Sequence, residues 1–347
     1  MTTQTPTLAD APQKGRAARV GSFIRSSNWT RELALVPAIA LAMIVGAVLS
    51  PQFLTATNIL NNILVTSAVL GIVVVAESII LISGYFDLSL ESVVGLAPML
   101  AVWLVLPAAA GGSGWGVPIW VAIAAMFALS IVVGLINGTL VAKLKLNAFM
   151  VTLAMLILLR GLTMGLSGGQ TLSGLPKEFL VLGSAKWFGI SIQIWLFALI
   201  LTAAAIFMRS HPVGRKLYAM GGNNAAAAAA GIKTNRLTIG VFVAGAIIAA
   251  FAGLMLTGRI ASVTANQGDG MIFTVFAAAV IGGISLNGGK GSMIGALCGV
   301  LLLGIIQNIL VLSQVPSFWI KAIYGLIILG ALIFNYLAGS KRTRRVV

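Results

Sequence analysis

The stretch "ILNNILVTSAVLGIVVVAESIILI" (residues 59–82) is 24 residues long and contains a single ionisable side chain, Glu77. A helix of about 20 apolar residues is long enough to cross the hydrocarbon core of a bilayer. The apolar residues here run on continuously instead of alternating with polar ones, which favours a helix over a strand of a membrane barrel. The stretch therefore predicts a membrane-spanning helix.

The rest of the chain has the same character. Hydrophobic residues make up 59% of its 347 residues and charged residues only 8%, whereas a soluble domain carries about 25% charged residues. We therefore expect an all-α polytopic membrane protein with about ten transmembrane helices. The eighth is short enough to be re-entrant. The predicted spans are 33–49, 59–82, 89–107, 117–140, 148–166, 191–208, 236–258, 271–285, 291–312 and 317–337.

The basic residues predict the orientation. With the amino terminus inside, 17 of the 22 lysines and arginines fall on inside segments, so both termini are expected in the cytoplasm of a bacterium, with the protein in its plasma membrane. The basic residues lie between apolar runs, where they face the anionic lipid of the cytoplasmic leaflet, and this accounts for the net charge of +15. The charge therefore does not indicate a nucleic-acid partner. The expected organisation is a basic tail (1–32), a transmembrane domain (33–338) with a cytoplasmic segment at about 210–235, and a second basic tail (339–347).

No stretch of the sequence predicts catalysis or a metal site. The single histidine, His211, has no partner at metal-ligand spacing, and no nucleophile and base can be paired. The segment "GGISLNGGKGS" (282–292) resembles a phosphate-binding loop but has Ile284 and Gly291 where that motif needs glycine and a hydroxyl residue. We expect a tight cytoplasmic turn instead, formed by Gly282, Gly283, Gly288, Gly289, Lys290 and Gly291.

Several polar residues fall in or beside predicted spans, where they are costly. Glu77 belongs either to a polar pathway or to a hydrogen-bond network between helices. Asp87 either caps the following helix or belongs to the same pathway. Arg160 lies in a span and can offset a carboxylate. The candidate pathway or intramembrane polar residues are Glu77, Asp87, Glu91, Asn61 and Asn62.

The cytoplasmic segment contains "NNAAAAAAGI" (223–232), with six consecutive alanines. Alanine favours helix, Asn223 or Asn224 can cap its start, and Gly231 suits its end. Two turns of helix are unstable alone in water, so this helix must pack on something. The sequence leaves open whether that is a groove of a partner or the chain itself.

Three stretches resemble the permease subunits of ribose- and xylose-type ABC sugar importers. They are "SGYFDLSLES" (83–92), "GRKLYAMGGNNAAAAAAGI" (214–232) and "AAAVIGGISLNGGKGSMIGA" (277–296). The resemblance implies a second permease copy, cytoplasmic ATPase subunits that bind ATP and magnesium, and an extracytoplasmic sugar-binding protein, with no cofactor or enzymatic activity in this chain. An alternative is a secondary transporter or channel for a small neutral solute.

The resemblance also assigns the alanine helix. In the family a short cytoplasmic helix docks into each ATPase, and the matching residues here are Gly221, Gly222, Asn223, Asn224, Ala225, Ala226, Ala227, Ala228 and Gly231. The chain departs from the family pattern by having alanine at Ala225 and Ala228, where charged or polar residues are usual, and by Tyr85 and Glu91 in place of glycines.

Overall fold

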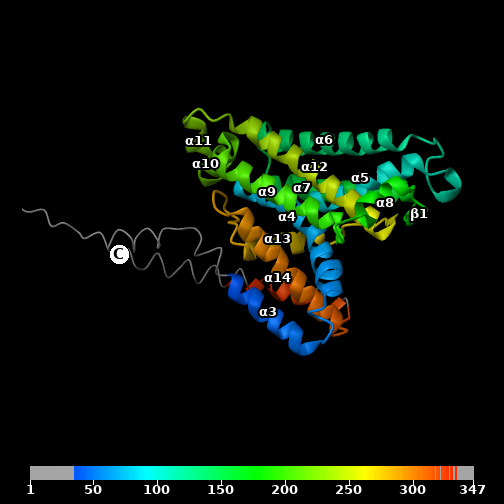
Figure 1. Cartoon of the computed structure of the whole chain (residues 1–347). Helices are drawn as coiled ribbons and strands as arrows, with labels where there is room; N and C mark the ends of the chain where they lie inside the picture. Colours follow the sequence, from blue (N-terminus) through cyan, green and yellow to red (C-terminus); the bar gives the residue numbers. More distant parts are fainter. Residues whose placement is uncertain (1–34, 317, 321, 328, 331–332, 334–347) are drawn as a thin grey trace, which may run out of the picture.

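A computed structural model describes residues 35–316, 318–320, 322–327, 329–330 and 333. The predicted tails 1–32 and 339–347, and much of the predicted span 317–337, lie outside these residues. Within them the chain is a bundle of helices (Figure 1), as the sequence predicts. Six helices of the described part of the chain are long and apolar enough to cross a membrane: Asn58–Ile82, Ile119–Ala142, Ala148–Ser167, Ile192–Ser210, Thr234–Ile260 and Met293–Leu312.

The helices match the predicted spans closely along the described chain. In order they are α3 (Val36–Leu49), η2 (Asn58–Leu64, a π-helix continuing into α4), α4 (Val65–Ile82), α5 (Leu90–Val105), η3 (Ala108–Ala110), α6 (Ile119–Ala142), α7 (Ala148–Ser167), α8 (Lys177–Ser184), α9 (Ile192–Ser210), α10 (Pro212–Gly222), α11 (Asn224–Ala229), α12 (Thr234–Ile260), α13 (Met271–Ile281) and α14 (Met293–Leu312). The sequence did not predict α8 and α10, because neither is long enough to resemble a span.

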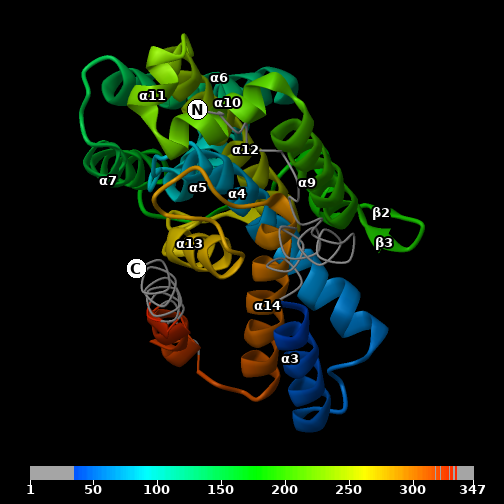
Figure 2. The ribbon, with the colours of Figure 1, turned by 90° about the vertical axis from the view of Figure 1, so that its left-hand side faces the viewer.

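Helix α12 packs against α4, α5, α6 and α8. Glycines allow this close approach: a Cβ added at Gly134 or Gly138 of α6 would lie 2.5 Å from the Cα of Val243 or 2.7 Å from that of Ile239 on α12. In lipid, where apolar side chains gain little by leaving the solvent, such contacts between small residues are a main source of helix association. Helices α13, α14 and α3 lie together along one flank (Figure 2).

Helix α13 (Met271–Ile281) ends four residues before the end of the predicted span 271–285, so the predicted length of this span is wrong. It ends at Ile281 because Gly282 packs against the backbone of α14, where a Cβ would lie 2.7 Å from the carbonyl carbon of Gly295, and Gly283 turns the chain with a φ of 83°. Eleven residues span about 16 Å, roughly half the hydrocarbon core, so α13 is a half-length helix, as a re-entrant segment would be.

The bundle has two distinct ends (Figure 1). Helices α10 and α11 lie at one end, while α8 lies at the other together with short strand pairs. The strands are β1 (Leu172–Ser173) paired with β4 (Ser262–Val263), and β2 (Lys186–Trp187) paired with β3 (Ile190–Ser191), both antiparallel.

Candidate functional site

The alanine stretch forms the helix that the sequence predicts. Asn223 caps α11, its Oδ1 accepting a hydrogen bond from the backbone N–H of Ala226 at 3.0 Å. Gly231 follows in the left-handed region with a φ of 81°, which a residue without a Cβ adopts at little cost. The predicted cap and the predicted stop are both confirmed.

The two sides of α11 differ in exposure. Ala227 is 5% exposed and faces the chain's own core, whereas Ala225, Ala226 and Ala228 are exposed. The helix therefore packs on its own chain through Ala227 and presents a smooth, uncharged methyl surface outward. Both alternatives left open by the sequence, packing on the chain and docking to a partner, are compatible with this arrangement.

Four glycines join the α10–α11 segment to the bundle, and we call them the glycine junction: Gly84, Gly221, Gly288 and Gly289. Gly289 N–H donates to the carbonyl of Ile82, the last residue of α4, at 2.8 Å. A Cβ on Gly221 would overlap that same carbonyl oxygen, and one on Gly288 would lie 2.7 Å from the Cα of Gly84. Three chain segments thus meet backbone to backbone, with no room for a side chain.

Side chains reinforce the junction. The hydroxyl of Tyr85 accepts a hydrogen bond from Asn224 Nδ2 at 3.0 Å and lies 3.1 Å from Thr238 Oγ1 on α12. Tyr218 on α10 donates to the carbonyl of Gly291 at 2.9 Å. Tyr85, which replaces a family glycine, therefore adds a tether between α11, α12 and the end of α4.

The segment 282–292 is the tight turn predicted from its glycines. Positive φ angles occur at Gly283, Gly288, Gly289 and Gly291. Lys290 is exposed, and its backbone carbonyl accepts from Ser285 N–H at 3.0 Å. The turn brings Gly288 and Gly289 against α10, so it forms one face of the glycine junction.

Glu77 and Asp87 lie in a buried polar cluster between α4, the α4–α5 connection and α6. Both are at most 1% exposed. Glu77 Oε1 accepts from the N–H of Asp87 at 3.3 Å, and Asp87 Oδ1 accepts from the N–H of Ser89 at 2.9 Å. Asn137 Nδ2 then donates to Ser89 Oγ at 2.9 Å. In this conformation Glu77 is a bonding partner between elements and does not line an open path.

The cap proposed for Asp87 is wrong in detail. Helix α5 begins at Leu90 with Ser89 at its N-cap, so Asp87 lies too early and instead bonds within the preceding turn. Its side chain is also buried, at 1% exposure. Asn137 was not foreseen, although an amide inside the apolar run 117–140 is itself a signal of a hydrogen-bonded position.

Substitution of Glu77 tests this cluster. Glu77→Gln keeps an acceptor oxygen of the same reach, so folding and transport should stay near wild type. Glu77→Leu leaves the N–H of Asp87 buried without an acceptor, which costs about 1–3 kcal/mol, and should lower the yield of monodisperse protein in detergent and its thermal midpoint. Equal behaviour of Glu77→Leu and wild type would show that the carboxyl group is dispensable.

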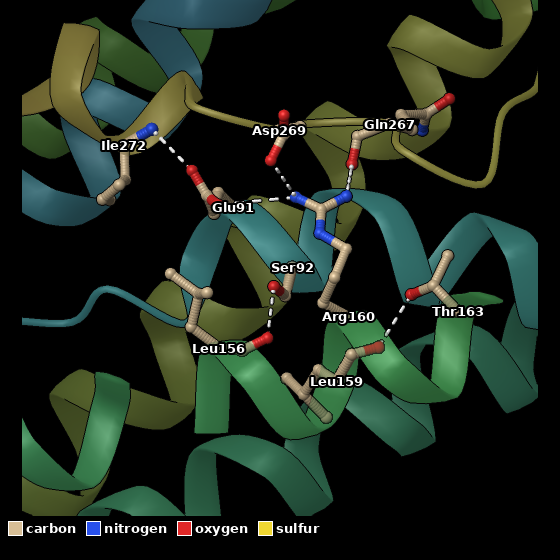
Figure 3. Close-up of polar contacts among 9 residues, drawn as sticks. All are labelled: Glu91, Ser92, Leu156, Leu159, Arg160, Thr163, Gln267, Asp269 and Ile272. Atoms are coloured by element: carbon tan, nitrogen blue, oxygen red, sulfur yellow. Dashed lines mark hydrogen bonds and ion pairs between the residues drawn. The ribbon is translucent and has the colours of Figure 1, made fainter. Parts of the chain in front are cut away.

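Glu91 belongs to a second network, centred on Arg160 of α7 (Figure 3). Arg160 NH2 lies 3.4 Å from Glu91 Oε1 and 3.7 Å from Asp269 Oδ1, and its NH1 donates to the carbonyl of Gln267 at 3.0 Å. Glu91 Oε2 accepts the N–H of Ile272 in the first turn of α13 at 3.1 Å. Arg160 thus offsets a carboxylate, as expected, and the network fixes α13 to α5 and α7.

Asn61 and Asn62 lie in η2 and are exposed. Asn62 Nδ2 donates to Asn58 Oδ1 at 2.9 Å. Asn58 in turn forms a reciprocal amide pair with Asn308 of α14, with donor–acceptor distances of 2.8 and 2.9 Å. The sequence pointed to the exposed asparagines of this region and missed the buried pair beside them.

In the described part of the chain no group of three or more histidine, cysteine, aspartate or glutamate side chains is placed to hold a metal ion. The long apolar helices of the bundle, joined by buried polar networks, are those of a polytopic membrane protein. The chain belongs to the family described as the permease component of branched-chain amino acid transport systems, whose model matches residues 59–334.

Individual relatives agree with this membership. The chain is 34% identical over 310 residues to the ribose import permease protein RbsC of Haemophilus influenzae, covering 88% of this chain and 93% of that protein. It is 32% identical to the L-arabinose transport system permease protein AraH of Escherichia coli K12, covering 97% and 100%. It is 31% identical to the autoinducer 2 import permease LsrC of Escherichia coli O9:H4, covering 88% and 86%. No solved structure matches. The membership sets aside a secondary transporter or channel.

Proposed function

We propose that the chain is the membrane-spanning subunit of an ABC importer for a monosaccharide, driven by a separate ATPase and supplied by an extracytoplasmic binding protein. Relatives named for ribose and L-arabinose import support the substrate class. The observation that carries the proposal is the α10–α11 segment, which presents an exposed alanine surface outward and is held to three parts of the bundle by the glycine junction.

The two sides of α11 have separate roles in this proposal. The exposed side, with Ala225, Ala226 and Ala228, docks in a groove of the ATPase by shape, since it carries no charge. The inward side, through Ala227 and the neighbouring glycine junction, passes a displacement of the docked helix to α4 and the 282–292 turn. Backbone contacts without intervening side chains are stiff, so the motion is transmitted as a rigid-body shift.

The proposal includes the other subunits of the importer. Two permease copies enclose the sugar path, ATP and magnesium bind to the ATPase subunits, and this chain needs no cofactor or catalytic residue. The excess of basic residues on one set of loops, including the segment around α10 and α11, supports ten spans with both termini in the cytoplasm.

Reconstitution tests the function. Proteoliposomes containing the permease and the ATPase that co-purifies with it, with ATP enclosed and loaded binding protein outside, should take up labelled ribose, arabinose or xylose. Neither ADP inside nor ATP placed only outside should support uptake. Uptake that persists without ATP, or that needs an ion gradient, would contradict the proposal.

A further inference from the structure

Asp269 is the exposed member of the Arg160 network and lies just before α13. Its partner Arg160 is the thirteenth residue of the 20-residue helix α7, about 18 Å along the axis from Ala148 and about 10 Å from Ser167. The preceding Gly268 packs against Glu91 and Val94 of α5. Arg160 belongs to the interior of a helix long and apolar enough to cross a membrane, and its contact with Asp269 points to a position for Asp269 between the two ends of α7, although Asp269 belongs to a connecting loop.

The side chains of the network differ in exposure. Those of Glu91 and Arg160 are 5% and 13% exposed, whereas that of Asp269 is 59% exposed. Asp269 Oδ1 faces Arg160, and no hydrogen bond to Oδ2 is present among the described residues. A carboxylate exposed at this depth is not stable against lipid, because intramembrane charges face a bundle interior or a water-filled space. Arg160 and Glu91 hold the loop so that one carboxylate oxygen stays open.

An aromatic ring lies at the same end of α13. Phe273, in the first turn of that helix, is 63% exposed. A carboxylate accepts hydrogen bonds from sugar hydroxyls, and an aromatic face packs against the apolar C–H side of a sugar ring. The two side chains together offer both kinds of contact that a neutral sugar makes.

We infer that Asp269 and Phe273 line the translocation path and form a transient contact for the hydroxyls and ring of the passing sugar, with Arg160 as the positioning residue for Asp269. This rests on the proposed import function. A single open carboxylate oxygen gives a contact that is weak enough to release the sugar, as a permease requires.

Accessibility is the first test. In a Cys298→Ala background, which removes the single native cysteine, the Asp269→Cys variant should react with a charged, membrane-impermeant methanethiosulfonate. The control is Leu158→Cys, 54% exposed and about 200° around α7 from Arg160, since successive residues are about 100° apart; it should not react. Absence of reaction at position 269, or equal reaction at both positions, would overturn the inference.

The second test measures how tightly sugar uptake is coupled to ATP hydrolysis. It uses the labelled sugar, ribose, arabinose or xylose, that the wild-type complex imports. Asp269→Ala should lower the sugar imported per ATP hydrolysed about tenfold, the worth of one hydrogen bond to a charged group, with ATPase activity retained. Asp269→Asn keeps an acceptor oxygen, so its ratio of sugar imported to ATP hydrolysed should fall much less. An unchanged ratio in Asp269→Ala, or equal loss of ATPase activity and uptake, would overturn the sugar contact. If the wild-type complex imports none of these sugars with ATP, the proposed function is wrong. The labelling experiment would still show whether position 269 is accessible to water.

Discussion

Gly221→Val is expected to abolish uptake, because the added side chain has no space between α4 and the 282–292 turn. Even a Cβ at this position would overlap the carbonyl oxygen of Ile82 and lie 2.7 Å from the N–H nitrogen of Gly289. Both neighbours are backbone atoms in a hydrogen bond with each other, so neither can turn aside as a side chain would. Overpacking of this kind costs about 1–3 kcal/mol for each misfit and more when the backbone must move.

The next residue provides a matched control. A Cβ at Gly222 meets nothing within 4 Å, and alanine is favoured over glycine in a helix by about 1 kcal/mol. Gly222→Ala should therefore fold and transport as well as wild type, while Gly221→Ala is impaired and Gly221→Val is inactive. The measurements are the yield of inserted, monodisperse permease and ATP-driven uptake. If Gly221→Val and Gly222→Ala behave alike, the glycine junction does not constrain the protein.

Ala228→Trp is expected to break docking of the ATPase while leaving the permease folded. Ala228 is exposed on α11, and a helix that docks by shape alone tolerates little added bulk. Recovery of the ATPase in a pull-down with solubilised permease should fall about tenfold or more, as for a residue at the centre of an interface. ATP-driven uptake should fall with it.

Two variants separate docking from packing. Ala228→Ser keeps the residue small and should bind the ATPase normally. Ala227→Trp places the same ring on the buried side, where Ala227 is 5% exposed, and should lower the stability of the permease itself. Normal recovery of the ATPase with Ala228→Trp would mean that α11 is only a connector.

The spans were predictable because each is a continuous apolar run whose length is set by the bilayer. The cap at Asn223 and the stop at Gly231 were predictable for a similar reason: the groups that interact are a few residues apart. Local sequence therefore determined most helices and the whole of α11.

The networks were not predictable, because they depend on how distant helices are placed. Arg160 and Glu91 are 69 residues apart, and Asn137 and Ser89 are 48 apart. A single sequence shows that such residues are polar in an apolar run, but not which of them meet. The glycine junction was hidden for the same reason. The short helices α8 and α10 were missed because propensity alone does not identify a helix that depends on tertiary contacts.

The amide pair between Asn58 and Asn308 has a consequence for biogenesis. The two residues are separated by 250 positions, which at 5–20 residues per second takes on the order of 10–50 s to synthesise. During that time Asn58 is made but its partner is not, and α3 lacks α14, the helix that it packs on. Helix α3 and the segment at Asn58 thus leave the ribosome long before α14 completes their packing, and until then they depend on the insertion machinery to shield a buried amide from lipid.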